Sequence, residues 1–163
     1  MTHFSPEQQI AFDKYVSGEN IFITGPGGSG KSYLIKKIAS HAKQNEKKIA
    51  VCAMTGCAAI LLNCNAKTLH SWAGIGLARG DDNPIVTRII TNKFKRNFWK
   101  YTDVLVLDEV SMLSVKLFNL LDLIGRRVRK SPLPFGGIQL VFCGDFFQLP
   151  PIGNDDEPES KQF

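Results

Sequence analysis

A glycine-rich segment at residues 25–32, with the sequence GPGGSGKS, constrains the fold of this chain more than any other feature. It fits the pattern GxxxxGK[ST] and lies between a short apolar run and a segment with helical periodicity. Glycines let the backbone curl so that successive N–H groups point at phosphate oxygens, and the helix that follows adds its positive end. A chance match in a chain of this length has a frequency of roughly 1% or less. The segment therefore predicts a nucleotide-phosphate site between a strand and a helix.

The side chains and the backbone of this segment have separate predicted roles. Lys31 would place a cation on the β- and γ-phosphates, and the Ser32 hydroxyl would coordinate magnesium. The positions whose backbone would surround the phosphates are Gly25, Pro26, Gly27, Gly28, Ser29 and Gly30. ATP and Mg²⁺ are therefore the expected cofactors. The alternative is a flexible glycine turn with an incidental lysine.

Two adjacent carboxylates follow the apolar run at residues 104–107. Because successive side chains of a strand point to opposite faces, Asp108 and Glu109 can have different roles. Asp108 would hold the magnesium shell, and Glu109 would orient and polarise the attacking water. The alternative is a strand that ends in a solvated acidic turn. A glutamate directly after the aspartate favours an NTPase over a small-molecule kinase. In such a kinase the acceptor substrate supplies the attacking hydroxyl, so no residue is needed to orient a water.

Strand-like and helix-like segments alternate along the chain. The expected helices cover residues 5–18, 31–44, 56–62 and 114–128, and the expected strands cover residues 20–24, 48–53, 104–107 and 139–143. Uninterrupted apolar strands are typical of a sheet that is buried on both faces. The alternation therefore predicts an α/β fold with a mostly parallel central sheet and helices on both faces.

Residues 79–100 interrupt this alternation, because they are polar, basic and poorly periodic. The residues predicted to break the chain there are Gly80, Asp81, Asp82 and Pro84. We expect one domain over residues 1–152 that contains this irregular insert. Residues 153–163 are expected to be a polar acidic tail that leads to a missing remainder.

Basic side chains give the chain a net charge of +5, a weak indication of a polyanionic partner. They gather in two runs: Arg88, Lys93, Lys95, Arg96 and Lys100, and Arg126, Arg127, Arg129 and Lys130. Each run is a solvated face, an electrostatic track for single-stranded DNA, or a contact with a further domain.

The cysteines Cys52, Cys57, Cys64 and Cys143 show no zinc-binding spacing. We expect them to be reduced, buried and inert, which suits an intracellular protein in the nucleus, a mitochondrion, a virus-infected cell or a bacterial cytoplasm. No stretch reaches 18 apolar residues and no secretory signal is visible, so no membrane partner is expected.

Two glutamines each have two interpretations. Gln8 occupies the capping-box position of a helix that begins at Ser5-Pro6, and its amide could close that box or pair with an adenine edge. Gln148 follows the strand at residues 139–143 and could reach the γ-phosphate. It could equally belong to a turn stiffened by Pro150 and Pro151.

Together these motifs resemble the PIF-type (petite integration frequency) DNA helicases, relatives of RecD and of the phage Dda helicase in superfamily 1B. The resemblance runs from Phe4 to about Pro151. Besides the glycine-rich segment it includes FSPEQ at 4–8, TGCAA at 55–59, TLHSWAGIG at 68–76, LDEVSML at 107–113, PFGGIQL at 134–140 and GDFFQLPP at 144–151. TLHSWAGIG and PFGGIQL are more diagnostic than the glycine-rich segment.

The resemblance implies a RecA-like P-loop NTPase fold and the first motor domain of an ATP-dependent 5′-to-3′ DNA helicase. It implies that Gln8 reads adenine and that Gln148 contacts the γ-phosphate. Thr55, Thr68 and His70 match segments that lie along single-stranded DNA, although His70 could instead pack to hold a loop. The aromatic residues that could stack on bases are Trp72 and Phe94, with a core role as the alternative for Trp72.

The sequence also departs from the resemblance. Cys52 and Met54 stand where relatives often carry Thr or Ser, which weakens direct side-chain contact between that strand and DNA. Nothing matches the second RecA-like domain, whose arginines reach the γ-phosphate; an arginine finger contributes about 10³–10⁵ in rate. We therefore expect this chain alone to bind ATP, to hydrolyse it very slowly and not to unwind duplexes. The alternative is a nucleotide-dependent binding or switch module without helicase activity.

Overall fold

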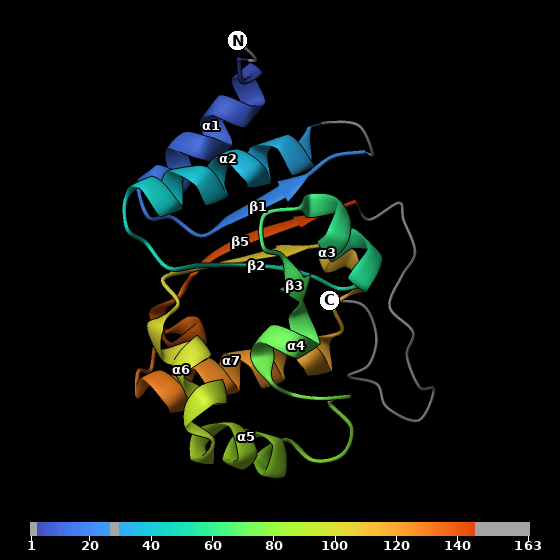
Figure 1. The fold of residues 1–163 in the computed structure, drawn as a ribbon, viewed down its shortest axis with the longest axis vertical. Helices are drawn as coiled ribbons and strands as arrows, with labels where there is room; N and C mark the ends of the chain where they lie inside the picture. Colours follow the sequence, from blue (N-terminus) through green and yellow to red (C-terminus); the bar gives the residue numbers. More distant parts are fainter. Residues whose placement is uncertain (1–2, 27–29, 146–163) are drawn as a thin grey trace.

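The computed structural model describes residues 3–26 and 30–145 and shows a sheet between two layers of helices (Figure 1). The described strands are β1 (Ile21–Thr24), β2 (Ile49–Ala53), β3 (Lys67–Thr68), β4 (Val104–Asp108) and β5 (Gln139–Gly144). They form one sheet in the order β1-β5-β4-β2-β3, and every pair is parallel. The predicted α/β fold with a parallel sheet is confirmed.

Seven α-helices and two short 3₁₀-helices surround this sheet in the described part of the chain. The α-helices are α1 (Pro6–Val16), α2 (Lys31–Gln44), α3 (Gly56–Leu62), α4 (Leu69–Ala73), α5 (Asp82–Thr91), α6 (Lys93–Tyr101) and α7 (Val115–Arg129). The 3₁₀-helices are η1 (Val110–Met112) and η2 (Pro134–Gly137). In Figure 1, α1 and α2 lie above the sheet and α4 to α7 lie below it.

Alternate residues of the central strands enter two separate hydrophobic cores. Val104 and Val106 of β4 pack with side chains of α1, α2 and α3. Leu105 and Leu107 pack with side chains of α4, α5 and α7. This period of two is that of a strand buried on both faces. Asp108 continues the alternation of Val104 and Val106, so it points to the face that carries α2.

The carboxyl ends of the parallel strands meet at one edge of the sheet. The register pairs Thr24 of β1 with Gly144 of β5. Ala53 of β2 pairs with Asp108 of β4 on one side and with Thr68 of β3 on the other. The segments that follow these strands therefore leave the sheet side by side, which is where α/β proteins bind ligands.

Residues 79–100 contain two helices, so the prediction of an irregular insert is wrong. The side chains that α5 and α6 bury are Ile85, Val86, Ile89 and Trp99. Asp81 is the N-cap residue of α5, and Asn92 caps α6 by accepting a hydrogen bond of 3.1 Å from the Lys95 N–H. The polar residues predicted to break the chain instead begin a helix. Each helix has at most 10 residues, so its apolar face covers too few turns to give a clear period.

Trp72 belongs to the core and does not stack on bases. Only 4% of its surface is exposed, and its ring centroid lies 4.5 Å from that of Trp99. The Trp99 indole donates a hydrogen bond of 3.0 Å to the Ala73 carbonyl. The core interpretation of Trp72 is therefore confirmed. Phe94, in contrast, is 73% exposed.

The PFGG sequence is a tight turn in which two backbones touch. Phe135 and Gly136 both have positive φ, 52° and 66°. A Cβ on Gly136 would lie 2.3 Å from the carbonyl oxygen of Gly125 in α7, and a Cβ on Gly125 would lie 2.6 Å from the Phe135 carbonyl carbon. The glycines therefore allow the turn that precedes β5 to lie directly on α7.

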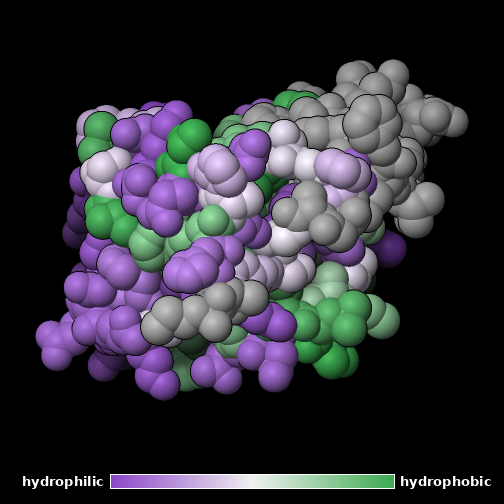
Figure 2. Space-filling view, turned by 90° about the horizontal axis from the view of Figure 1, so that it is seen from above, coloured by the Kyte–Doolittle hydropathy of each residue, from purple (hydrophilic) through white to green (hydrophobic). Residues whose placement is uncertain are grey.

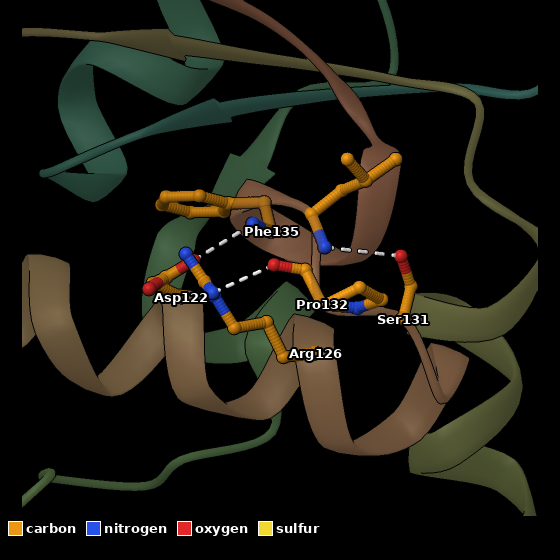
Figure 3. A network of polar contacts seen from close by, with 6 residues as sticks. Asp122, Arg126, Ser131, Pro132 and Phe135 are labelled. Carbon is orange, nitrogen blue, oxygen red and sulfur yellow. Dashed lines mark hydrogen bonds and ion pairs between the residues drawn. The ribbon is translucent and has the colours of Figure 1, made fainter.

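Two arginines of α7 hold this turn, and Figure 3 shows the contacts of one of them, Arg126. Arg126 pairs with Asp122 at 2.9 Å and donates a hydrogen bond of 2.7 Å to the Pro132 carbonyl. Asp122 also accepts a hydrogen bond of 2.8 Å from the Phe135 N–H. Arg129 donates to the backbone carbonyls of Trp99, Lys100, Thr102 and Gly136. The interpretations of this basic run as a solvated face or as a DNA track are therefore wrong for Arg126 and Arg129. Arg127 and Lys130, in contrast, are exposed.

The cysteine prediction is only partly right. Cys52 and Cys143 are buried free thiols, and burial raises the pKa of Cys52 to about 12. Cys64 is half-buried and Cys57 is exposed, so the expectation of burial is wrong for Cys57, which lies in the solvent-facing first turn of α3. Among residues 3–26 and 30–145, none of the helices has the length and hydrophobicity that a membrane crossing requires.

Candidate active site

The glycine-rich loop connects β1 to α2, as its sequence predicts. The Lys31 ammonium donates hydrogen bonds to the carbonyls of Gly25 and Pro26, the latter at 3.0 Å. Lys31 is therefore turned toward its own loop, in the space where phosphates would lie. Three predicted phosphate-binding residues, Gly27, Gly28 and Ser29, lie outside the described residues.

A cleft of about 600 Å³ opens beside this loop, between α1 and β1. Gln8, Phe22, Pro26 and Lys31 are among the residues that line it. Its volume falls within the range of about 300–1,000 Å³ that small-molecule sites occupy. A larger groove of about 1080 Å³ runs along the edge of β2 and is lined by Trp72 and Phe94, but none of the residues predicted to bind nucleotide or magnesium lines it. The smaller cleft is therefore the candidate nucleotide site.

Gln8 joins α1 to the glycine-rich loop. Its Oε1 accepts a hydrogen bond of 2.9 Å from the Ser5 N–H, which completes the predicted capping box. Its Nε2 donates to the Gly30 carbonyl at 3.1 Å. Each end of the amide keeps one further hydrogen-bonding position, so capping does not prevent contact with a base. Gln9 instead pairs with Asp13 on the exposed side of the helix.

Asp108 ends β4 on the face of the sheet that carries α2. Its carboxylate accepts a hydrogen bond of 2.9 Å from the Glu109 N–H. Burial raises the pKa of Asp108, and this hydrogen bond and the Lys31 cation partly oppose the rise. The Lys31 cation is therefore near enough to Asp108 to favour its charged form.

Ser32 and Asp108 fit the chemistry of a magnesium site. Ser32 is exposed in the first turn of α2, and Asp108 is half-buried at the end of β4. A hydroxyl and a carboxylate are hard oxygen donors, and Mg²⁺ is usually held by one or two carboxylates together with waters and phosphates. In the described part of the chain, no three His, Cys, Asp or Glu side chains gather as a ready-made metal site. These two residues would therefore hold the ion together with nucleotide phosphates.

Glu109 leaves the strand in a left-handed conformation, with φ 60° and ψ 38°. Such a conformation costs a residue other than glycine about 1–2 kcal/mol. The Oε2 of Glu109 accepts a hydrogen bond of 3.2 Å from the Thr55 hydroxyl. Asp108 thus lies near Lys31, and Glu109 bonds to Thr55. Two features direct these carboxylates to different neighbours: the alternation of side chains along the strand and the left-handed turn at Glu109.

Thr55 connects the predicted DNA-binding residues to the acidic pair. It is the N-cap residue of α3, and its Oγ1 accepts a hydrogen bond of 3.3 Å from the Ala58 N–H. Its contact with Glu109 does not follow from any motif in the sequence. Both residues directly follow apolar strands, but chain order does not reveal that β2 and β4 are neighbours.

Thr68 is the last residue of the next strand, β3, and His70 lies in the helix α4 that follows it. Thr68 pairs with Ala53 and caps α4 by accepting a hydrogen bond of 3.3 Å from the Ser71 N–H. His70 is half-buried, and burial lowers its pKa, so its ring is neutral at neutral pH. The fold therefore brings Thr55 and Thr68 to one edge. His70 can offer a hydrogen bond there but little positive charge, and both interpretations of it remain.

Two further predictions fall on residues outside the described ranges. Gln148 and the tail at residues 153–163 both lie there. The preceding strand, β5, lies between β1 and β4, and its last residue pairs with Thr24. The chain therefore enters the GDFFQLPP segment between the glycine-rich loop and the acidic pair, and the role of Gln148 stays a prediction.

Comparison with known sequences gives a consistent match. A family model described as PIF1-like helicase matches residues 3–162. The protein "ATP-dependent DNA helicase PIF5" of Trypanosoma brucei brucei is 41% identical over 162 residues, which is 99% of this chain. The chain covers only 17% of that relative's own length.

Solved structures match over nearly the whole chain as well. The crystal structure of Pif1 helicase from Candida albicans has a TM-score of 0.86 and 43% identity, covering 93% of this chain and 34% of that one. Pif1 helicase from Bacteroides, crystallised with ADP-AlF3 and ssDNA, has a TM-score of 0.79 and 31% identity. That match covers 98% of this chain and 36% of the Bacteroides chain.

Proposed function

Because the chain belongs to the PIF1-like helicase family, we propose that residues 1–152 are the ATP-binding motor domain of an ATP-dependent DNA helicase. The observation that carries this proposal is that Lys31 lies near enough to Asp108 to affect its pKa, with Glu109 next to Asp108 at the same edge of the sheet and a nucleotide-sized cleft beside Lys31. The 5′-to-3′ direction of movement rests on the family resemblance alone.

The residues of this edge divide the work of ATP hydrolysis. Lys31 would exchange its contacts with loop carbonyls for contacts with the β- and γ-phosphates. Ser32 and Asp108 would hold Mg²⁺, which neutralises phosphate charge when bound. Glu109 would orient the attacking water and accept its proton. Gln8 would pair with adenine through the free positions of its amide, and Gln148 would contact the γ-phosphate.

Single-stranded DNA would bind along the neighbouring strand ends. Thr55 follows β2, Thr68 ends the adjacent parallel strand β3, and both are partly exposed, which supports a common binding edge. The Bacteroides relative was crystallised with ssDNA, a property of that protein. His70 would add a neutral hydrogen-bonding group, and the exposed ring of Phe94 would be free to stack on a base.

A second RecA-like domain would complete the site. The matched crystal structures are about three times as long as this chain, which covers 34% and 36% of them. Figure 2 shows a hydrophobic patch on an otherwise largely hydrophilic face, and exposed apolar patches mark interaction surfaces. Two of the most exposed large apolar side chains are Ile60 and Leu61 of α3, each 77% exposed. We expect slow hydrolysis without that domain, since an arginine finger contributes about 10³–10⁵ in rate.

The proposal is tested by titrating the chain with a fluorescent ATP analogue in the presence of Mg²⁺. Lys31→Ala should weaken binding at least tenfold, a loss of about 1.4 kcal/mol, because it removes the cation that faces the phosphates. Lys37→Ala is the matched control, since Lys37 is an exposed lysine of the same helix. Equal affinity of Lys31→Ala and the unaltered chain would contradict the proposal.

A further inference from the structure

The Thr55 hydroxyl takes part in two hydrogen bonds that use different atoms. Its oxygen accepts from the Ala58 N–H at 3.3 Å, which caps α3. Its proton is donated to Oε2 of Glu109 at 3.2 Å. Capping requires only the oxygen, so the bond to Glu109 is not a consequence of capping. A hydroxyl has a single proton, so it can serve only one acceptor at a time.

The order of the strands shows toward which side of β4 this bond holds the Glu109 carboxylate. The glycine-rich loop follows β1, which lies on one side of β4 beyond β5, whereas Thr55 follows β2 on the other side of β4. Neighbouring strands are about 4.8 Å apart. A Glu109 carboxylate bonded to Thr55 is therefore held toward β2 and away from the loop that would bind the γ-phosphate.

We propose that Thr55 is a DNA-responsive latch on Glu109. Without DNA, the Thr55 proton holds the carboxylate toward β2. A DNA phosphate that contacts Thr55 offers the proton a competing anionic acceptor, and Glu109 is then released toward the glycine-rich loop. Thr55 is partly exposed and the next two residues, Gly56 and Cys57, are exposed, so the hydroxyl is accessible to such a phosphate. The inference rests on the proposed function and adds the route by which strand binding reaches the hydrolysis site.

Thr68 provides a matched comparison within the same edge. It follows the adjacent strand and caps α4 as Thr55 caps α3, with a hydrogen bond of 3.3 Å from the Ser71 N–H. In the described part of the chain, however, its hydroxyl donates to no carboxylate. Substitutions at Thr68 therefore remove a cap and a DNA contact without affecting Glu109.

The test measures Mg-ATP hydrolysis by the full-length protein that contains this chain, with and without a saturating oligothymidine. Thr55→Val removes the donated proton. Thr55→Asp also removes it but keeps an acceptor for the Ala58 N–H, so it covers the case in which Thr55→Val does not fold. Both should raise kcat without DNA by about tenfold, the effect of weakening one hydrogen bond to a charged group. KM for ATP should stay the same, because Thr55 is not among the residues that would contact ATP or Mg²⁺.

Conservative and matched variants separate the latch from loss of structure. Thr55→Ser keeps the proton and should retain the low rate without DNA. Thr68→Val should weaken DNA binding. Thr91→Val, at an exposed threonine of α5 whose hydroxyl donates to the Thr87 carbonyl, should leave the rate without DNA unchanged. A rate without DNA that is unchanged or lower in both Thr55→Val and Thr55→Asp would overturn the latch.

Glu109→Gln distinguishes failure of the latch from failure of the proposed function. If the unaltered protein hydrolyses ATP with DNA and Glu109→Gln does not, the proposed function stands and the Thr55 variants alone decide the latch. If Glu109→Gln hydrolyses ATP as the unaltered protein does, the assignment of Glu109 is wrong and the latch falls with it.

Discussion

Replacing Gly136 with alanine should destabilise the chain more than the same change at Gly137. Both glycines have positive φ, 66° and 87°, so alanine at either position costs about 1 kcal/mol of left-handed strain. Their surroundings differ. A Cβ on Gly136 would lie 2.3 Å from the Gly125 carbonyl oxygen, whereas a Cβ on Gly137 would have no neighbour closer than 3.6 Å.

The steric overlap at Gly136 adds about 2 kcal/mol, as overpacking of a core does. Gly136→Ala should therefore lower the free energy of unfolding by about 3 kcal/mol and Gly137→Ala by about 1 kcal/mol. For a chain of this size, these losses correspond to roughly 6–12 °C and 2–4 °C in melting temperature. Thermal unfolding followed by circular dichroism at neutral pH measures both shifts.

Gly80→Ala provides a second control for backbone strain. Gly80 has φ 87° and no atom within 4 Å of a built Cβ, so its variant should behave as Gly137→Ala does. Equal melting temperatures for Gly136→Ala and Gly137→Ala would refute the reasoning. They would show that the close approach of the turn to α7 does not determine the need for glycine at position 136.

Two further predictions concern charge. Burial raises the pKa of Asp108 above its ordinary value of 3.8. The contribution of Asp108 to the free energy of unfolding is therefore fully present below its pKa in the unfolded chain, and it is lost as pH rises through its pKa in the folded chain. Asp108→Asn should therefore melt above the unaltered chain at pH 7, with a gap that closes toward pH 4, and should lose ATP hydrolysis; a lower melting temperature at pH 7 would contradict this. Lys93 and Lys100 are exposed on α6, and replacing both by alanine should reduce the salt slope of single-strand binding by about 1.4, or 0.7 per phosphate contact. An unchanged slope would exclude α6 from the DNA track.

Local sequence signals were sufficient for the elements that adjoin the motifs. The helices at Lys31–Gln44 and Gly56–Leu62 have the predicted bounds, and β4 and β5 are each one residue longer than predicted. These elements combine apolar runs with clear start and stop residues. The helices α4, α5 and α6 were not predicted, although α5 and α6 are longer than α3, because they take their stability from packing against their neighbours.

The same division applies to the candidate site. The sequence placed the glycine-rich loop after a strand and placed Asp108 at a strand end, because both follow from a motif and its immediate context. The contact between Thr55 and Glu109 joins residues 54 positions apart. It depends on β2 lying next to β4 and on the left-handed turn at Glu109, and neither is encoded in local periodicity.

Two residues of the edge carry an energetic cost in the absence of ligand. Asp108 is a half-buried carboxylate whose pKa is raised by burial, and Glu109 has a left-handed backbone. Both conditions disfavour the folded chain, and a magnesium ion bound with ATP would relieve the first by stabilising the charged carboxylate. Binding of Mg-ATP to the folded chain should therefore raise its free energy of unfolding, so the affinity for Mg-ATP and the stability of this edge are linked. The bond from Thr55 is then the only described contact that satisfies the Glu109 carboxylate without nucleotide, which explains why its loss should affect the rate of hydrolysis rather than the fold.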